Sequence, residues 1–292
     1  MSARTHPAGL GMTYTKILAA VNEHLNSEVS ARYAHHLAQT TQSLLYLCYI
    51  AEKGVSARDF TGAEEAVKRL FHKAKESGVR VESVFDSGDP VNKIKEIVRT
   101  EGIDIVFAAT RREDIEKRFY AGTVSRKLSL ILPCSVALVR VVHMGRIHPR
   151  TILVPLKARI HHISERTYFT AMLNRAFDSK LFLFHAQKKI TKFFRGELHL
   201  TPIEWEKKIP HDILRFIDHL DRYSVRHEKR LTPGSAGRHI MIEAASKRHD
   251  LIVMGASERS LLHSFIWGNP VEEVLRETPC DLIILKPRYE DT

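Results

Sequence analysis

Short apolar runs alternate with amphipathic stretches along the first 140 residues, a pattern that predicts alternating strands and helices. The apolar runs predict strands at residues 16–21, 43–50, 80–86, 103–108 and 135–139. The amphipathic stretches predict helices at residues 27–41, 62–77, 90–100 and 123–132. Because the strand runs are continuously apolar rather than alternating, we expect a parallel sheet that helices cover on both faces.

The same pattern returns in the remainder of the chain. Strands are predicted there at residues 151–156, 180–185, 224–231, 251–254 and 281–285. Helices are predicted at residues 164–178, 204–222, 236–247 and 270–276. Five parallel strands with helices on both faces form a doubly wound α/β sheet, and ligands of such sheets bind at the carboxyl ends of the strands.

The two parts of the chain are copies of one another, because matching residues keep one register. Three pairs of matching residues are each 146 positions apart: Asp104 and Asp250, Gly122 and Gly268, Pro133 and Pro279. The first strands match at an offset of 135, so the second copy is longer by about 11 residues in the part that precedes Asp250. We therefore predict two tandem five-stranded domains, at residues 13–142 and 150–288, with a linker near 142–150. They are called the first half and the second half below.

Composition agrees with two ordinary globular domains, since 292 residues correspond to about two domains of roughly 150 residues. The sequence contains no apolar stretch near the roughly 18 residues of a membrane span, and its N-terminus has no apolar signal core. Three cysteines without C-x-x-C spacing argue against a disulfide framework or a cysteine zinc site. A cytoplasmic location is expected. The net charge of +11 favours anionic partners.

Several motifs resemble those of the universal stress protein family, over nearly the whole chain and in two fused copies. They are the Gly88-Asp89-Pro90 turn, the D-I-V strand from Asp104, the Gly122-Thr123 loop and Pro133-Cys134 before a last apolar strand. The resemblance implies the Rossmann-like fold of the adenine nucleotide alpha hydrolases. It also implies an intramolecular pseudo-dimer paired through the last strands, residues 135–139 and 281–285, and allows two chains to dimerise.

Several members of this family bind ATP or AMP through a G-x2-G-x9-G-[S/T] loop and an acidic residue after the first strand. Glycines let backbone N–H groups approach the phosphates, and the N-terminus of the next helix adds roughly 0.3–1 kcal/mol for an anion. In the first half the glycine positions fall on Ala109, Arg112 and Gly122, and the acidic position falls on Asn22. The pattern is therefore degenerate there.

The first half nevertheless keeps a coherent candidate nucleotide site. Arg111 and Arg112 bring two cations that are able to pair with phosphates bidentately. Asn22 is still able to hydrogen-bond a ribose or base. The residues of this candidate site for ATP or AMP are Asn22, Ala109, Thr110, Arg111, Arg112, Gly122, Thr123 and Val124. The alternative is that the two arginines form a solvated surface pair.

The second half departs further from the pattern, at Lys157, Gly255, Glu258, Gly268 and Asn269. Glu258 stands where a glycine would approach the phosphates, and two like charges about 4 Å apart cost about 4 kcal/mol at an effective dielectric of about 20. We expect no ATP in this degenerate second site. A Lys157–Glu258 ion pair is expected to be able to fill it, and an uncharged, adenosine-like ligand stays open.

No catalytic or metal-ligating set is evident. The sequence lacks P-loop, zincin and G-x-S-x-G motifs. The adjacent pairs His35-His36 and His161-His162 point about 100° apart on a helix, which disfavours a shared metal ion. The cysteines, Cys48, Cys134 and Cys280, lie in or beside apolar strands and are predicted to be buried.

Residues 188–230 form the longest and least matched part of the second half, with 11 Lys/Arg against 7 Asp/Glu. One interpretation is a docking surface for an acidic protein, a membrane face or nucleic acid, with exposed aromatic residues at Phe193, Phe194 and Trp205. We favour a helix that covers the sheet, because Ile213, Phe216, Ile217 and Leu220 have helical spacing. Under that interpretation Trp205 and Leu214 are partly in the core, and Phe193-Phe194 has no explanation.

Three functions follow from these features. The leading interpretation is a cytoplasmic, non-enzymatic, stress-related regulatory protein that acts through protein partners and has degenerate nucleotide sites. The second is an ATP or AMP sensor that uses the loop of the first half. The third is an accessory subunit docked on a membrane transporter or respiratory complex, suggested by the basic charge and by Phe193-Phe194. Nucleic acid is not an expected partner, since no groove-reading helix or stacking motif is evident.

Overall fold

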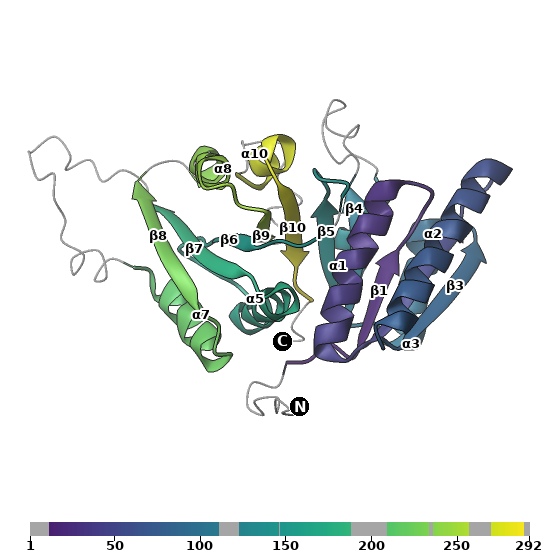
Figure 1. Cartoon of the computed structure of the whole chain (residues 1–292), viewed down its shortest axis with the longest axis horizontal. Coiled ribbons are helices and arrows are strands. Elements are labelled where there is room, and N and C mark those ends of the chain that lie inside the picture. The colour runs from purple at the N-terminus through teal and green to yellow at the C-terminus, as the bar shows by residue number, and fades with distance from the viewer. Residues whose placement is uncertain are drawn as a thin grey trace, which may run out of the picture.

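A single ten-stranded sheet runs through the chain in the computed structural model, which describes residues 12–110, 123–145, 147–187, 209–233, 236–256 and 270–288 (Figure 1). Its order is β3-β2-β1-β4-β5-β10-β9-β6-β7-β8. The strands of the first half are β1 (Lys16–Ala20), β2 (Leu44–Ala51), β3 (Val81–Ser87), β4 (Ile105–Thr110) and β5 (Ser135–Arg140). Those of the second half are β6 (Thr151–Pro155), β7 (Lys180–Gln187), β8 (His227–Pro233), β9 (Leu251–Gly255) and β10 (Asp281–Lys286).

Helices cover both faces of this sheet, as the continuous apolar runs predict. One face carries α1 (Leu25–Thr41), α2 (Ala57–Glu76), α5 (Ile163–Phe177) and α7 (His211–Arg222). The other carries α3 (Pro90–Glu101), α4 (Val124–Ile131), α8 (Ala236–Ser246) and α10 (Pro270–Glu277). Successive strand residues enter opposite cores: Ile17 and Ala19 pack under α1 and α2, and Leu18 packs on the other side. The doubly wound α/β fold is confirmed.

The two halves meet edge to edge, because β5 and β10 pair in antiparallel fashion. All other strand pairs in this sheet are parallel. Leu138 pairs with Ile284, which is its own repeat equivalent at an offset of 146 residues. A local two-fold axis requires this pairing. The last strands therefore join as the resemblance implies, and the two five-stranded sheets are continuous.

Buried polar contacts reinforce this junction. Tyr14 donates its hydroxyl hydrogen bond to Glu165 Oε1 over 3.2 Å, and Ser135 Oγ bonds to the same carboxylate oxygen. Tyr33 of α1 donates to Asp281 Oδ2 over 2.8 Å. The carboxylates of Glu165 and Asp281 thus lie in the second half and accept hydrogen bonds from hydroxyl groups of the first half.

The repeated aspartate at the start of the D-I-V motif has a structural role. Asp104 Oδ2 accepts hydrogen bonds from the backbone N–H of Thr15 at 2.7 Å and from its hydroxyl at 2.8 Å. Asp250 Oδ2 accepts the same two bonds from Thr151, each at 2.9 Å, and a third from the N–H of Arg150. Each aspartate therefore fixes the beginning of the first strand of its half beside the fourth.

The predicted boundaries differ from the structure most at three places, each for a local reason. Helix α2 begins at Ala57 instead of residue 62, because Ser56 Oγ accepts the N–H of Asp59 and caps the earlier turn. Residues 209 and 210 are not helical, and α7 begins after Pro210. Strand β8 begins at His227, because Ser224 has a φ of 55° and ends the preceding helix.

Helix α7 covers the sheet as its spacing predicts. Ile213, Phe216, Ile217 and Leu220 are buried. Leu214 is 40% exposed, so the expectation that it is partly in the core is wrong; it lies one position beyond Ile213, outside the apolar stripe. Trp205, Phe193 and Phe194 lie outside the described residues.

Candidate functional site

A pocket of about 780 Å³ opens in the first half at the carboxyl ends of β1, β2 and β4. Strand β1 pairs with β2 on one side and with β4 on the other. The order in which the chain adds strands to the sheet therefore reverses between β1 and β4. Doubly wound sheets bind ligands at this topological switch point. We call the space the first-half pocket.

Four of the predicted site residues line the first-half pocket: Asn22, Ala109, Thr123 and Val124. Thr110 does not line it and is a correction to the predicted site. Its side chain is 2% exposed, and its hydroxyl donates to the carbonyl oxygen of Val139 in β5. The other predicted members, Arg111, Arg112 and Gly122, lie outside the described residues.

Thr123 stands at the N-terminus of α4, where the first backbone N–H groups of a helix lack intrahelical partners. Its backbone is extended, with φ −68° and ψ 146°, but its hydroxyl caps no N–H group of the helix. The buried Oγ1 has no hydrogen-bond partner among the described residues. An anion placed here would meet a hydroxyl donor and the positive end of the helix dipole.

Asn22 follows β1 and is partly committed to its own loop. Its Oδ1 accepts a hydrogen bond from the N–H of His24 at 3.0 Å. The backbone N–H of Asn22 donates to Ser27 Oγ at 2.9 Å, which ties the loop to the first turn of α1. The side-chain carbonyl is therefore already used in holding the rim of the pocket.

The wall of the pocket that β2 and the following turn provide was not predicted from the sequence. The signal was present, since a strand was predicted there and its carboxyl end must reach the same edge. The missed residues are Tyr49, Ile50, Glu52, Lys53, Gly54, Ser56 and Asp59. Tyr49 is 3% exposed, and its hydroxyl has no hydrogen-bond partner within the part of the chain described.

In the second half a side chain covers the matching position. Arg166 of α5 lies on Gly255, where a Cβ would be only 2.2 Å from Nη1 of the guanidinium. Its Nη2 donates to the carbonyl oxygen of Ala256 at 3.0 Å. Burial lowers the pKa of Arg166 to about 10, and burial followed by the charge of Arg166 lowers the pKa of Lys157.

Arg166 therefore occupies the space over the carboxyl end of β9. A Lys157–Glu258 ion pair was expected to be able to fill this space. Glu258, Gly268 and Asn269 lie outside the described residues, and that pair stays a prediction. The sequence offered no signal for Arg166, because it stands inside a helix and matches no motif.

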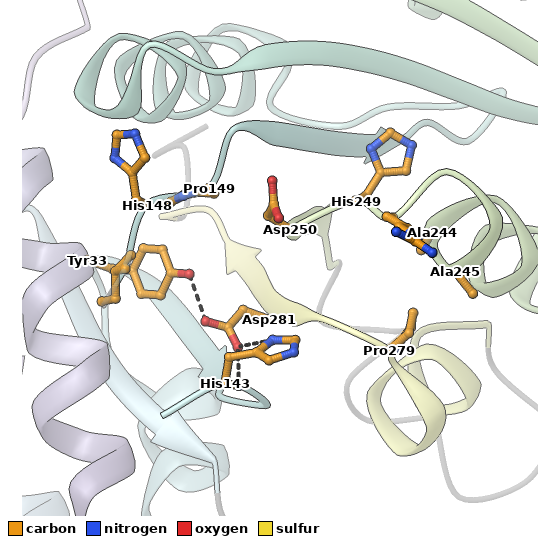
Figure 2. A pocket seen from close by; sticks show the side chains of 12 residues that line it. Tyr33, His143, His148, Pro149, Ala244, Ala245, His249, Asp250, Pro279 and Asp281 are labelled. Carbon is orange, nitrogen blue, oxygen red and sulfur yellow. Dashed lines mark hydrogen bonds and ion pairs between the residues drawn. The ribbon is translucent and has the colours of Figure 1, made fainter. Parts of the chain in front are cut away.

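A second pocket, of about 470 Å³, lies between the halves. Figure 2 shows Tyr33 pointing to Asp281, with His143 and Asp250 nearby, and the linker crossing beside them. Both carboxylates are engaged in the structural hydrogen bonds described above. This pocket is at the amino ends of β9 and β10, the opposite end of β9 from Gly255.

The other chemical candidates are engaged in packing. Burial raises the pKa of each cysteine, Cys48, Cys134 and Cys280, to about 12. His35 Nε2 bonds to Ser77 Oγ at 2.7 Å. Across the described ranges, no group of three or more His, Cys, Asp or Glu side chains is placed to hold a metal ion. No helix in those ranges combines the length and apolar character needed to cross a membrane.

Comparison with known proteins gives a consistent result. The model of the Universal stress protein family matches residues 13–140 and 167–286. Universal stress protein YxiE of Bacillus subtilis (strain 168) is 29% identical over 104 residues, which are 35% of this chain and 70% of that protein.

Several solved structures match nearly the whole chain, among them the following two. A universal stress protein from Archaeoglobus fulgidus DSM 4304 has a TM-score of 0.67 at 15% identity, covering 97% of this chain and 100% of that one. The cytoplasmic domain of a prokaryotic cation chloride cotransporter has a TM-score of 0.57 at 12% identity, covering 95% and 96%. At these identities the likeness concerns the fold.

Proposed function

The chain belongs to the universal stress protein family, and from this premise we propose that it is a non-enzymatic regulatory protein that binds an adenine nucleotide in the first-half pocket. AMP and ATP are the candidate ligands. The regulatory output passes to protein partners in the cytoplasm, and binding rather than chemistry on the nucleotide is the signal.

The observation that carries the proposal is the orphaned hydroxyl of Thr123 at the start of α4, in a pocket at the topological switch point. A buried hydroxyl without a partner costs about 1–3 kcal/mol, which a phosphate oxygen would recover. In the sequence, Arg111 and Arg112 follow β4 directly and offer the positive charge that a phosphate needs.

One nucleotide per chain is proposed, because Arg166 covers Gly255 in the second half. A phosphate there would first have to displace a guanidinium that is hydrogen-bonded to Ala256.

A titration of the full chain with AMP and with ATP by calorimetry tests the proposal. We expect a stoichiometry near one, and we expect Thr123→Val to weaken binding about tenfold or more, since a hydrogen bond to a charged group contributes about 1.5–3 kcal/mol. Thr110→Val is the matched control, because its hydroxyl bonds within the sheet. Absence of heat with the wild-type chain, or unchanged binding by the Thr123 variant, would contradict the proposal.

Docking on a membrane transporter is a second candidate, supported by the net charge of +11. One protein of similar fold over 95% of the chain is the cytoplasmic domain of a prokaryotic cation chloride cotransporter. Recovery of the chain wholly in the soluble fraction of a low-salt lysate would argue against this candidate.

A further inference from the structure

We propose that Tyr49 determines ligand specificity in the first-half pocket, by donating a hydrogen bond to an uncharged acceptor on the ligand, away from its phosphate. The inference rests on the proposed function and specifies the ligand class: a nucleotide with phosphate at one end only. Tyr49 lies on β2, and Thr123 comes after β4 in the chain. Strand β1 lies between β2 and β4, so these two strands are two interstrand spacings of about 4.8 Å apart.

The first support is the state of the Tyr49 side chain. The residue is 3% exposed, and its ring is held by edge-to-face contacts with Phe60 and Phe85, at centroid distances of 5.8 and 6.3 Å. The hydroxyl has no hydrogen-bond partner among the residues that the structure describes, although the residue lines the pocket. Buried polar groups are nearly always paired in native proteins, so this one calls for a partner from outside the chain.

The second support comes from the matching position of the second half. His185 is the sixth residue of β7, as Tyr49 is the sixth residue of β2. Its Nδ1 forms a hydrogen bond with the carbonyl oxygen of Leu156 at 2.8 Å. The half whose site is filled therefore satisfies this polar group internally, and the half with the open pocket does not.

The third support is the charge around the hydroxyl. Burial raises the pKa of Tyr49, and the carboxylates of Glu23, Asp59 and Glu52 raise it further. The hydroxyl is therefore protonated at neutral pH and is able to donate. Lys53 also lines the pocket, so this end carries three carboxylates against one ammonium group. The carboxylates would repel a negatively charged acceptor. A neutral oxygen or nitrogen of the base or ribose would not be repelled.

Calorimetric titration of the full chain with 5′-AMP tests the inference. Tyr49→Phe removes only the hydroxyl, and we expect it to weaken AMP binding about threefold to tenfold, the effect of one neutral hydrogen bond. Tyr46→Phe is the matched control, because Tyr46 lies on the same strand and donates to Glu101 instead. Its AMP affinity should equal that of the wild-type chain.

A second titration uses the wild-type chain alone and so does not depend on the folding of a variant. Adenosine 3′,5′-bisphosphate should bind at least tenfold more weakly than 5′-AMP, since its second phosphate would face the carboxylates. Equal affinities for the two ligands would overturn the inference. So would wild-type AMP binding by Tyr49→Phe together with weak AMP binding by Thr123→Val, and with either result the proposed function stands. A wild-type chain that binds neither ligand would overturn both.

Discussion

Matching residues of the two halves have taken different roles at the carboxyl ends of the strands. Ala109 lines a pocket, whereas its equivalent Gly255 lies under the guanidinium of Arg166. A Cβ at this position would overlap the guanidinium, so any larger residue would force Arg166 to move. A glycine that a motif search assigns to phosphate binding thus serves side-chain packing in this half.

His35 supplies a prediction about pH at the same scale. Its side chain is buried and bonded to Ser77, and burial, then the charges of His36 and Lys73, lower its pKa from 6.5 to about 4. The unfolded chain binds this proton more tightly, so the free energy of unfolding decreases as the pH falls from about 6.5 to 4. A shift of about 2.5 units corresponds to about 3 kcal/mol.

Urea unfolding between pH 7 and 4.5 measures this effect. We expect the free energy of unfolding to fall less steeply with acidification in His35→Gln than in the wild-type chain, whatever the difference between them at pH 7. Parallel pH profiles of the two proteins would contradict the assignment.

At the site, the sequence predicted the residues that a loop motif marks and missed those that tertiary packing brings in. Asn22, Ala109, Thr123 and Val124 follow strand ends or open a helix, so their positions could be inferred from topology. Thr110 was misplaced because it is still the last residue of β4, and its hydroxyl bonds to the carbonyl oxygen of Val139 in the neighbouring strand β5. Tyr49 could have been placed at the end of its strand, but nothing in the sequence states that its hydroxyl lacks a partner. Arg166 could not be selected, because nothing in the sequence states that it covers a glycine.

At the scale of elements, the apolar runs predicted every described strand, and the largest errors are at the ends of helices. The Gly88-Asp89-Pro90 turn shows what local sequence does determine. Gly88 has a φ of 134°, Asp89 accepts the N–H of Asn92 at 2.8 Å as the N-cap, and Pro90 begins α3. The cap at Ser56 follows the same chemistry but precedes the apolar periodicity, so the periodicity alone placed the start of α2 too late.

Strand anchoring by the repeated aspartates makes a prediction at this scale. Asp250→Ala removes the acceptor of three hydrogen bonds at the start of β6, and we expect the free energy of unfolding to fall by about 1–3 kcal/mol. Asp104→Ala should have a similar effect at β1.

Urea denaturation measures both variants, with the exposed Asp218→Ala on α7 as the control. If both aspartate variants unfold at the same urea concentration as the control, the aspartates do not anchor the strands.

At the scale of the whole molecule, the junction between halves depends on contacts far apart in sequence. Tyr33→Phe removes the hydrogen bond to the buried Asp281, and we expect a loss of about 1.5–3 kcal/mol in the free energy of unfolding. Tyr223→Phe is the control, since Tyr223 is buried but its hydroxyl makes no hydrogen bond within the described residues. Equal unfolding free energies of the two variants would show that the Tyr33–Asp281 bond contributes nothing.

The continuous pairing of β5 with β10 also bears on how such a protein diverges. In an assembly of two identical chains, every mutation is made twice and is tested in both copies at once. Here the two paired strands belong to one polypeptide, with Leu138 paired to Ile284. A mutation in one half therefore leaves the other half unchanged. Duplication followed by fusion thus permits the second half to cover its site with an arginine while the first half keeps an open pocket. Two identical chains encoded by one gene cannot differ in this way.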